Sequence, residues 1–356
     1  MHFRLKHIIP VFMAIAAMLT IGCSRPDEKE EGKLIKVPLR ISVASPDEQT
    51  LQPGSKAGSQ MAPENLNPIK SLAVFQYDGE GNLRNEIYRD ETGSYDENLF
   101  YHDYTQGGTS PGELSVTLDL TLRTGSTTIC LIANMPKEEC DSIRRNCRYL
   151  YNFQDFQTEV PYENMKELSE TDLGEGHLTT SYMSGYYQGN IQSGETLSVT
   201  LGRLISNFNI GIIVSDEHSW NYQQPQEIKL QLENIPMQTF VFPPRVSDYE
   251  GLDIPRGTFR EEPMRVSSTE YTRCYYYVAA FAALTEDDAC RLRISTTING
   301  QNREATVLLG NDEPGTPDRS YNVWRNSNYT FNLRLVPKGN KKSQYKARPG
   351  EIIVPL

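Results

Sequence analysis

Apolar and polar residues alternate with a period of two along much of the chain, which predicts β-strands with one face in a core and one face in water. The first such run covers residues 33–44, and its apolar positions are Ile35, Val37, Leu39, Ile41 and Val43. Pro38 interrupts this run and lacks a backbone N–H, so it predicts a sheet edge or a weakly paired position. Residues 45–68 show no periodicity and are rich in Pro, Gly, Ser and Gln, which predicts a long flexible loop.

Further strands are predicted by alternation or by short apolar runs at 71–77, 114–122, 127–133, 197–201, 204–214, 228–235, 275–281, 292–298, 305–309 and 329–335. Leu83, Ile87 and Tyr88 are assigned to a strand that returns beside residues 71–77. Asn299-Gly300 is the strongest two-residue signal for a β-hairpin. Helix-like patterns are confined to short pieces around Asp141–Tyr149 and Glu163–Leu168.

Many short strands with little helix predict an all-β protein built from two β-sandwich domains in tandem. One alternating run ends at Gly202 and another begins at Leu204, so the domains are expected at 33–202 and 203–337. Residues 338–356 are predicted to form a basic tail with a short terminal strand. A single large barrel is the alternative architecture.

Residues 1–22 have the pattern of an export signal. Arg4 and Lys6 precede an apolar run that is shorter than the ~20 residues of a membrane-spanning helix. Gly22-Cys23 follows, as a lipoprotein signal peptidase requires, so Cys23 is predicted to become the lipidated first residue. Thr20 stands where Leu or Val is usual, which leaves an ordinary secretory signal as the alternative. The acidic residues 23–32 predict a solvated tether.

The charge of the chain argues against a nucleic-acid partner. Asp and Glu total 46 against 35 Lys and Arg, a formal net charge of −11, and no basic stripe is present. The cysteines after Cys23 are Cys130, Cys140, Cys147, Cys274 and Cys290. Their spacing fits no zinc site. One or two disulfides are feasible in an oxidising compartment, with Cys140–Cys147 the easiest, whereas Cys130 lies in an apolar run and is expected to be buried.

The sequence carries no motif of an enzyme. His102, His177 and His218 lie far apart in polar contexts, and the chain contains no Gly-x-Ser-x-Gly, no His-Glu-x-x-His and no P-loop. We therefore expect no catalytic residues, no metal and no cofactor. Three consecutive tyrosines, Tyr275 to Tyr277, suit a contact surface for a protein or a glycan, but β-propensity explains them more simply.

Several segments together resemble the fimbrillin-like subunits of type V pili of Bacteroidia, including their lipoprotein anchors. The resemblance rests on the lipoprotein start with the strand 33–44 and on four further segments, namely 71–81 (SLAVFQYDGEG), 129–135 (ICLIANM), 201–210 (LGRLISNFNI) and 325–333 (RNSNYTFNL). They span nearly the whole chain in the order of the family. The resemblance implies two transthyretin-like β-sandwiches, surface exposure on the outer membrane through the lipid, and assembly with other fimbrial subunits by donor-strand exchange.

In shaft subunits of that family an arginine-specific protease removes the first strand, and a strand from the next subunit fills the groove. The equivalent groove plug here would be Ile35, Val37, Leu39, Ile41 and Val43. No arginine occurs between Arg40 and Arg84, so Lys56 is the candidate processing position. The tail after Pro337 is short, and Ile352, Ile353 and Val354 are the candidate C-terminal donor. Both departures favour an anchor or accessory subunit over a shaft subunit.

Two other functions stay open at this point. A surface glycan-binding lipoprotein of a polysaccharide-uptake system would use exposed tyrosines to bind its ligand. An envelope hydrolase with an unusual site would depend on the histidines. As a fimbrial subunit, the chain would serve adhesion and could contact a host protein or glycan.

Overall fold

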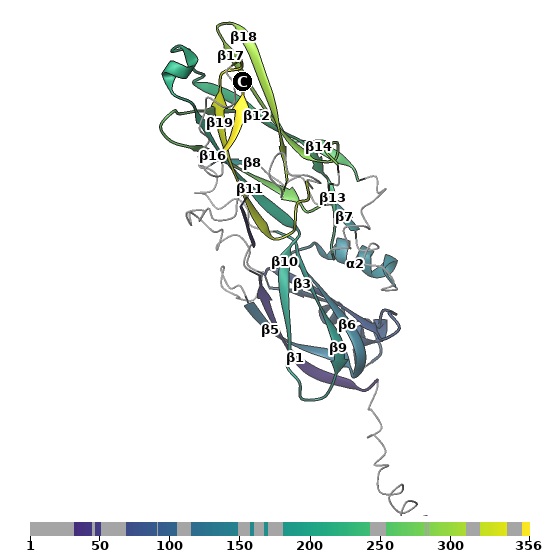
Figure 1. The fold of residues 1–356 in the computed structure, drawn as a ribbon. Coiled ribbons are helices and arrows are strands. Elements are labelled where there is room, and N and C mark those ends of the chain that lie inside the picture. The colour runs from purple at the N-terminus through teal and green to yellow at the C-terminus, as the bar shows by residue number, and fades with distance from the viewer. Residues whose placement is uncertain are drawn as a thin grey trace, which may run out of the picture.

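The computed structural model describes residues 32–44, 47–50, 69–90, 92–104, 115–148, 157–159, 167–169, 181–242, 254–281, 283, 285–310, 321–339 and 351–356. The predicted signal peptide, Cys23, Lys56 and His177 lie outside these residues. The described chain forms an elongated molecule of two lobes, with the N-terminal lobe below and the C-terminal lobe above in Figure 1. Within the described residues no helix is long and apolar enough to cross a membrane.

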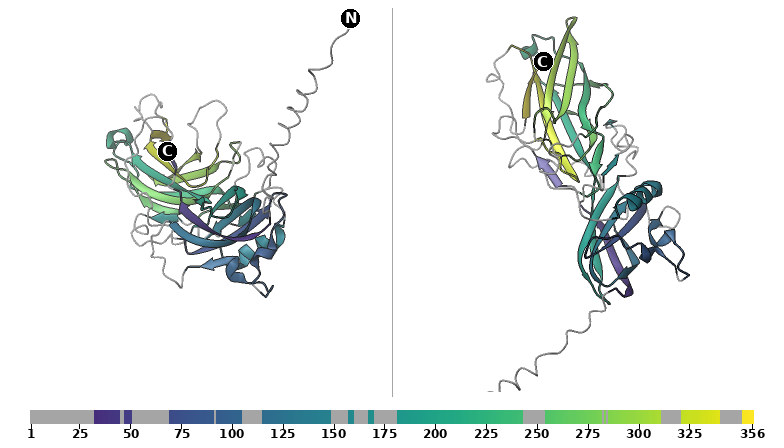
Figure 2. Two further views of the ribbon diagram at one scale, coloured as in Figure 1. Left: turned by 90° about the horizontal axis from the view of Figure 1, so that it is seen from below. Right: turned by 90° about the vertical axis from the view of Figure 1, so that its right-hand side faces the viewer.

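The N-terminal lobe is one seven-stranded sheet in the order β4-β3-β6-β9-β10-β1-β5. Its strands are β1 (Leu34–Val43), β3 (Ser71–Asp78), β4 (Tyr101–Asp103), β5 (Ser115–Arg123), β6 (Gly125–Ala133), β9 (Met183–Ile191) and β10 (Leu197–Arg203). β9 and β10 pair through two positions, Gly202 with Ser184 and Arg203 with Met183. The sheet folds over at this corner, so β10-β1-β5 forms one layer of a sandwich and β4-β3-β6-β9 the other (Figure 2).

Apolar side chains from both layers meet between them. The inward positions alternate with polar ones along the strands, as the period of two predicts. This core contains Val37, Leu39, Ile41, Leu72, Val74, Leu120, Leu122, Ile129, Leu131, Met183, Ile191, Leu197, Val199 and Leu201. β3 and β6 are buried on both faces, because a second cluster that includes Phe75, Tyr77, Cys130 and Ile132 lies on their other side.

Helical segments cover this second cluster. They are η1 (Asn85–Tyr88), η2 (Glu97–Leu99) and α2 (Lys137–Asn146), the last being the one α-helix within the described residues. α2 has glutamates in its first turn and arginines in its last, an arrangement that suits the helix dipole. It accounts for the helix predicted around Asp141–Tyr149. The cover also includes Tyr182, Val241 and Phe242, which come from later parts of the chain.

The C-terminal lobe is a sandwich of two sheets. The first sheet has the order β2-β19-β11-β16-β8, with β20 also paired to β19. Its strands are β2 (Asp47–Thr50), β8 (Glu167–Ser169), β11 (Ile205–Val214), β16 (Thr272–Ala279), β19 (Ser327–Val336) and β20 (Glu351–Pro355). The second sheet has the order β14-β12-β17-β18, with β15 also paired to β12. Its strands are β12 (Glu227–Pro236), β14 (Arg256–Thr258), β15 (Glu262–Arg265), β17 (Cys290–Ile298) and β18 (Gln301–Leu309).

One large apolar core fills the space between these two sheets. Phe208 packs edge to face against Tyr329 and Phe331, with ring centroids 5.4 and 5.3 Å apart. Tyr276 stacks on Phe259, and both Tyr276 and Tyr277 are buried, so these two tyrosines of the run serve packing, whereas Tyr275 is half-buried. Two smaller elements complete the structure: η5 (Glu217–Trp220), and the pair of β7 (Gln157–Glu159) with β13 (Gln238–Phe240).

The prediction of an all-β, sandwich-type fold is confirmed. The hairpin at Asn299-Gly300 is confirmed as well, since both residues have positive φ (52° and 73°) between β17 and β18. Two local predictions are wrong. Ile87 and Tyr88 lie in the 3-10 helix η1 rather than in a returning strand, and the piece predicted as a helix around Glu163–Leu168 ends in strand β8. In both places long-range packing overrides a weak local pattern.

Candidate functional site

Strand β1 is the central strand of the layer β10-β1-β5. It pairs antiparallel with β5 from Leu34 to Ser42 and parallel with β10 from Leu39 to Val43. Pro38 therefore lies immediately before the part of β1 that is paired on both sides. The predicted weak pairing at this proline is confirmed, whereas an edge position for the whole strand is wrong. The first strand of the chain thus lies inside a sheet between segments that are distant in sequence.

The side chains of β1 divide cleanly between the core and the surface. Val37, Leu39 and Ile41 are at most 1% exposed, and Ile35 and Val43 pack against the same core while partly buried. The residues between them point outward, and Arg40 and Ser42 are exposed. Burial of a Val, Leu or Ile side chain stabilises a fold by about 1.5–3 kcal/mol. The predicted plug residues therefore form one row that fills the space between the two layers.

Hydrogen bonds hold both ends of β1. At its start, the amide of Gly32 donates to the carbonyl of Thr124 (3.0 Å), and the amide of Thr124 donates to Lys33 (2.9 Å). At its end, the amide of Ala44 donates to the carbonyl of Leu201 (2.8 Å). The guanidinium of Arg203 donates to the carbonyl of Ala44 (3.0 Å).

Arg203 also connects β1 to the C-terminal lobe. Its Nη1 donates to Oδ1 of Asn326, 2.8 Å away, in the turn that precedes β19. Burial lowers the pKa of Arg203 from its ordinary value, because the charged form loses contact with water. The two segments 201–210 and 325–333, far apart in the sequence, thus meet at this side chain.

The chain crosses between the lobes directly after β1. β2 pairs parallel with residues 327–330 of β19, and Figure 2 shows it as a purple strand at the base of the C-terminal lobe. β20 pairs parallel with Asn332–Val336, the following part of the same strand. The second strand of the described chain, β2, and its last strand, β20, therefore both pair with β19.

Strand β20 holds the candidate donor residues Ile352, Ile353 and Val354. Val354 is buried in the core of the C-terminal lobe, and the other two are half-buried. A buried ion pair fixes the start of β20, where Nε and Nη2 of Arg334 donate to the carboxylate of Glu351 at 2.9 and 2.7 Å. These hydrogen bonds raise the pKa of Arg334, and the hydroxyl of Tyr271 donates to the same carboxylate. β20 is thus built into its own lobe.

The other residues considered for chemistry are dispersed. His102 lies on β4 in the N-terminal lobe, and His218 lies on η5 in the C-terminal lobe. Among the described residues, no group of three or more His, Cys, Asp and Glu could hold a metal ion. The five cysteines are free thiols, and Cys130, Cys140 and Cys147 are buried in the N-terminal lobe. Burial raises the pKa of each thiol of Cys130 and Cys140, which keeps them protonated.

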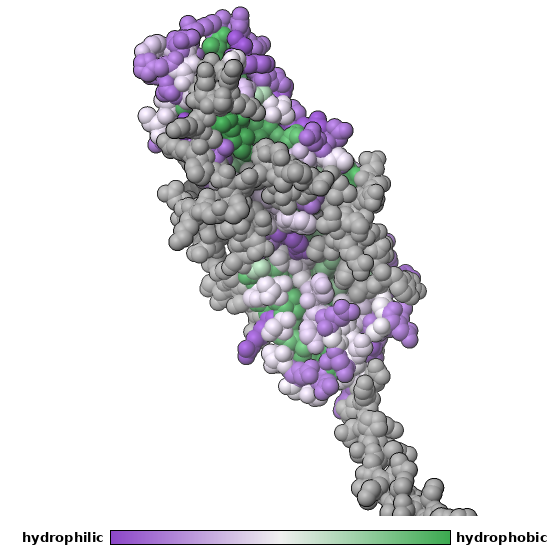
Figure 3. Space-filling model, in the orientation of Figure 1, coloured by the Kyte–Doolittle hydropathy of each residue, from purple (hydrophilic) through white to green (hydrophobic). Residues whose placement is uncertain are grey.

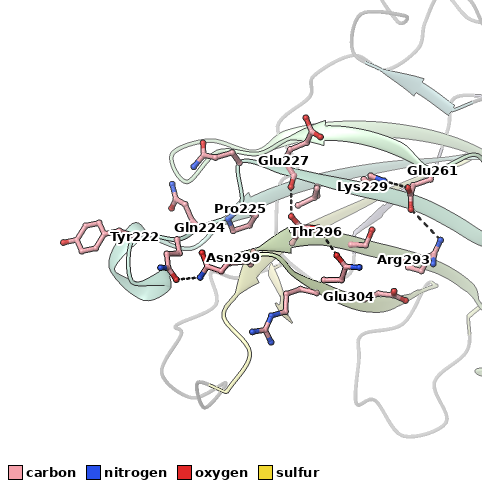
Figure 4. A pocket seen from close by; sticks show the side chains of 18 residues that line it. Tyr222, Gln224, Pro225, Glu227, Lys229, Glu261, Arg293, Thr296, Asn299 and Glu304 are labelled. Carbon is pink, nitrogen blue, oxygen red and sulfur yellow. Dashed lines mark hydrogen bonds and ion pairs between the residues drawn. The ribbon is translucent and has the colours of Figure 1, made fainter.

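Sequence reasoning missed two features that the structure displays. The first is the pair Arg203 and Arg325 at the junction of the lobes. These arginines lie in the segments 201–210 and 325–333, whose sequences indicate a family resemblance but not a contact between the lobes. The second is a hollow of about 790 Å³ in the C-terminal lobe (Figure 4). Its lining comes from separate stretches around residues 222–229, 261, 293–299 and 302–304. No local pattern indicates that these stretches converge.

Known proteins resemble this chain in structure rather than in sequence. No family model and no curated protein matches it. The tip fimbrial protein Mfa3 from Porphyromonas gingivalis is 12% identical, with a TM-score of 0.52 over 84% of this chain and 94% of that one. A candidate cell adhesion protein from Parabacteroides distasonis is 14% identical (TM-score 0.51, 84% of this chain and 88% of that one). Another from Bacteroides eggerthii is 10% identical (TM-score 0.52, 86% and 88%).

At such low identity the likeness concerns the fold. The chain has the two-lobed β-fold of Bacteroidia fimbrial and cell adhesion proteins, as its segment order predicts.

Proposed function

We propose that the chain is a structural subunit of a cell-surface fimbria that takes part in donor-strand exchange and serves adhesion. The observation that carries this proposal is the position of β1. It is the first strand of the described chain, yet it is paired on both sides and contributes a complete row of core residues. The groove between β5 and β10 that holds β1, here called the seat of β1, could be filled by an equivalent strand from another subunit.

The seat provides what strand addition needs. Backbone hydrogen bonds from β5 and β10 would supply affinity, and the space occupied by Val37, Leu39 and Ile41 would select alternate apolar side chains. The partner strand would come from another fimbrial subunit.

An anchor or accessory role fits the sequence better than a shaft role. Cys23 would carry the lipid and hold the chain on the outer membrane, eleven residues before β1 begins at Leu34. Lys56 is the candidate processing position. In an anchor, β1 would stay in its own seat. The chain would then contribute its C-terminal residues Ile352, Ile353 and Val354, which requires release of Glu351 from Arg334.

The role in the filament is tested by the N-terminal peptide and acyl state of the protein, measured by mass spectrometry in sheared filaments and in membranes. We expect a chain that begins at lipidated Cys23 and stays with the membrane. A chain that begins near Lys56 within a high-mass sheared ladder would contradict the anchor role and establish a shaft role.

The exchangeable seat is tested with a specific protease site introduced at Lys56. After cleavage, unfolding and removal of the N-terminal fragment, the protein is refolded with a synthetic peptide of residues 33–44. We expect the peptide to restore the N-terminal lobe, as measured by far-UV circular dichroism. The peptide with Leu39→Asp should fail, and the peptide with Arg40→Asp, an exposed neighbour, should succeed. Equal recovery without any peptide would refute the exchange mechanism.

A further inference from the structure

A second hollow, of about 420 Å³, lies in the N-terminal lobe and is lined by Asn85, Arg89, Tyr95, Arg144, Arg145 and Arg148. We call it the arginine hollow. Its lining combines η1 and the loop after it with the last turn of α2 and the chain just beyond that helix. Its volume is within the range of small-ligand sites, roughly 300–1,000 Å³. Where described residues are visible, the right-hand side of this lobe is largely hydrophilic (Figure 3). The arginine hollow therefore lies in a polar surface, and four of its six lining residues are cations.

The backbone at the end of α2 is held in place by the core of the lobe. The amide of Leu83 donates to the carbonyl of Arg148 (2.8 Å), and the hydroxyl of Tyr77 donates to the carbonyl of Cys147 (2.9 Å). Leu83, Tyr77 and Cys147 are all buried in the same cluster. Arg145 and Arg148 themselves are exposed. Their positions are thus fixed from the inside while their side chains remain accessible.

Arg144 gives the arginine hollow a donor of fixed orientation. Its guanidinium carbon lies 4.7 Å from the ring centre of Tyr95 and 5.2 Å from that of Phe100. Its Nη2 lies 3.3 Å from a carboxylate oxygen of Asp141. A planar guanidinium that lies against aromatic rings and a carboxylate keeps one plane, so its remaining N–H groups keep one direction.

The other three arginines carry charge that no described carboxylate offsets. Within the described residues, the guanidiniums of Arg145 and Arg148 make no hydrogen bond and no ion pair, and that of Arg89 donates to the carbonyl of Gly93 alone (2.7 Å). No described Asp or Glu lines the hollow. The helix dipole suits Arg144 and Arg145 in the last turn of α2, but it does not explain Arg89 on another element. Positive charge is therefore concentrated here on a chain whose net charge is −11.

Clustered guanidiniums suit a tetrahedral oxyanion. The planar fork of an arginine donates two parallel hydrogen bonds to the oxygens of a sulfate, a phosphate or a carboxylate. A sulfate or phosphate ester presents three terminal oxygens, so several arginines can contact it at once, whereas a carboxylate presents two. An uncharged ligand would leave the repulsion between the arginines in place. The chemistry of the lining thus favours a sulfate or phosphate ester.

The place of the arginine hollow narrows the kind of molecule that carries the ester. α2 lies at the upper end of the N-terminal lobe, whereas β1 starts at the lower end (Figures 1 and 2). A membrane to which the chain is anchored before β1 would therefore lie away from α2. A nucleic acid needs an extended basic surface, and this acidic chain has no basic stripe. A glycan with separate ester groups needs one compact site only.

From this arrangement we infer that the arginine hollow binds a sulfate or phosphate ester group of an anionic glycan. Arg89, Arg145 and Arg148 donate to the ester oxygens, and Arg144 adds a donor of fixed direction. The site does not involve β1, so it does not depend on the proposed strand exchange. The choice of a glycan over a membrane rests on the proposed lipid anchor.

The test uses the immobilised intact mature protein and dextran in four forms, namely unmodified, sulfated, phosphorylated and carboxymethylated to the same degree. All four share one polymer backbone, so differences in surface plasmon resonance report the charged group. We expect binding of the sulfated form, the phosphorylated form or both, and at least tenfold weaker binding of the other two. The ester that binds identifies the source of the anion.

Two single variants test the residues. Arg148→Ala and Arg89→Ala should each lower the affinity tenfold or more, because each removes charge-assisted hydrogen bonds. Both should keep the melting temperature, since neither guanidinium is bonded to another side chain among the described residues. Arg265→Ala is the matched control, because it removes an exposed arginine at the end of β15 in the C-terminal lobe, and it should leave the affinity unchanged.

Several results would overturn the inference. They are absence of binding to both esters, equal binding of the carboxymethylated form, and equal losses in Arg148→Ala and Arg265→Ala, which would indicate general charge attraction. If Arg148→Ala lowers the melting temperature, Arg89→Ala decides alone. Vesicles that contain phosphatidylglycerol form the last arm, and tighter binding to them than to either dextran ester would replace the glycan by a membrane surface.

Discussion

At the scale of single residues, buried polar groups show where the chain depends on long-range contacts. Arg203 is 9% exposed, and its guanidinium donates to Ala44 and Asn326, which are 159 and 123 residues away in sequence. A buried charge without partners would be strongly destabilising, so these bonds constrain both segments. The end of β1 is thereby fixed relative to the turn before β19.

His102 should make the stability of the N-terminal lobe depend on pH. Burial lowers its pKa from the ordinary value, and its Nε2 is buried without a hydrogen-bond partner among the described residues. The unfolded chain, whose histidine titrates near about 6.5, then binds the proton at higher pH than the folded chain. The free energy of unfolding therefore falls as the pH falls through that value, by at most about 1.4 kcal/mol per pH unit.

His102→Gln should remove this slope between about pH 7.5 and 5, as measured by urea unfolding at several pH values. Asp103→Asn is the control, because it changes the exposed residue next to His102 and leaves the histidine itself in place, so the slope should persist. An unchanged slope in His102→Gln would assign the pH dependence to another group.

At the scale of elements, the sequence reveals strands but not their neighbours. The alternation at 35–43 predicts β1 and its inward face, and Asn299-Gly300 predicts the β17–β18 hairpin, because both signals are local. The insertion of β1 between β5 and β10 joins residues up to about 160 positions apart, which no local pattern encodes. The hollow near Tyr222 could not be predicted from the sequence for the same reason, since its lining combines a loop with three strands.

The fold of the N-terminal sheet at the β9–β10 corner depends on a glycine. A Cβ atom at Gly185 would collide with the carbonyl oxygen of Thr200 and lie 3.0 Å from Cγ1 of Val199, both on β10. Backbone moves less readily than a side chain, so Gly185→Ala should destabilise the N-terminal lobe by about 1–3 kcal/mol. At Gly189, on the same strand, the added atom would meet the flexible side chain of Tyr187. Gly189→Ala should therefore cost clearly less in thermal unfolding, and equal costs would contradict a special role of the corner.

The attachment of β20 should depend on the carboxylate of Glu351, which is 2% exposed beside Arg334. Glu351→Gln removes the charge from two hydrogen bonds, each worth about 1.5–3 kcal/mol when charged. We expect amide hydrogen exchange in β20 to accelerate about 10- to 100-fold while the β11–β19 pairing keeps its protection. Glu262→Gln is the matched control, because its ion pair with Arg260 is shorter (2.6 Å) but exposed, and exposed pairs contribute little. Unchanged exchange in β20 would show that backbone pairing suffices to hold it.

At the scale of the whole molecule, the chain passes between the two lobes more than once, so the lobes are not two independent consecutive domains. β1 lies in one lobe and β2 in the other, and the segment after β13 returns Val241 and Phe242 to the N-terminal core. The N-terminal seat and the edge of β19 are thus parts of one connected structure. Replacement of β1 and β2 by strands from another subunit would therefore change the pairing in both lobes.

Arg325 is the residue that should couple the lobes most strongly. From the turn before β19 it donates to the carbonyls of Val241 (3.1 Å) and Ser184 (3.2 Å), and also to Gly202, so it spans the β9–β10 corner. Lysine has a single ammonium group and lacks the planar fork that reaches these acceptors together. Arg325→Lys should therefore leave buried carbonyls unpaired, at a cost of about 1–3 kcal/mol.

Unfolding can be followed separately in each lobe, because the two tryptophans, Trp220 and Trp324, both belong to the C-terminal lobe. In the wild type we expect tryptophan fluorescence and far-UV circular dichroism to report one common transition in urea. In Arg325→Lys the transition seen by circular dichroism should begin at lower urea, because the N-terminal corner loses its support and unfolds first. Arg303→Lys changes a half-buried arginine of β18 that bonds only to Gln301 on the same strand in the described contacts, so the transitions should remain coincident. Coincident transitions in Arg325→Lys would mean that β1, β2 and the return of Val241 join the lobes without this arginine, and the coupling would then belong to the backbone crossings.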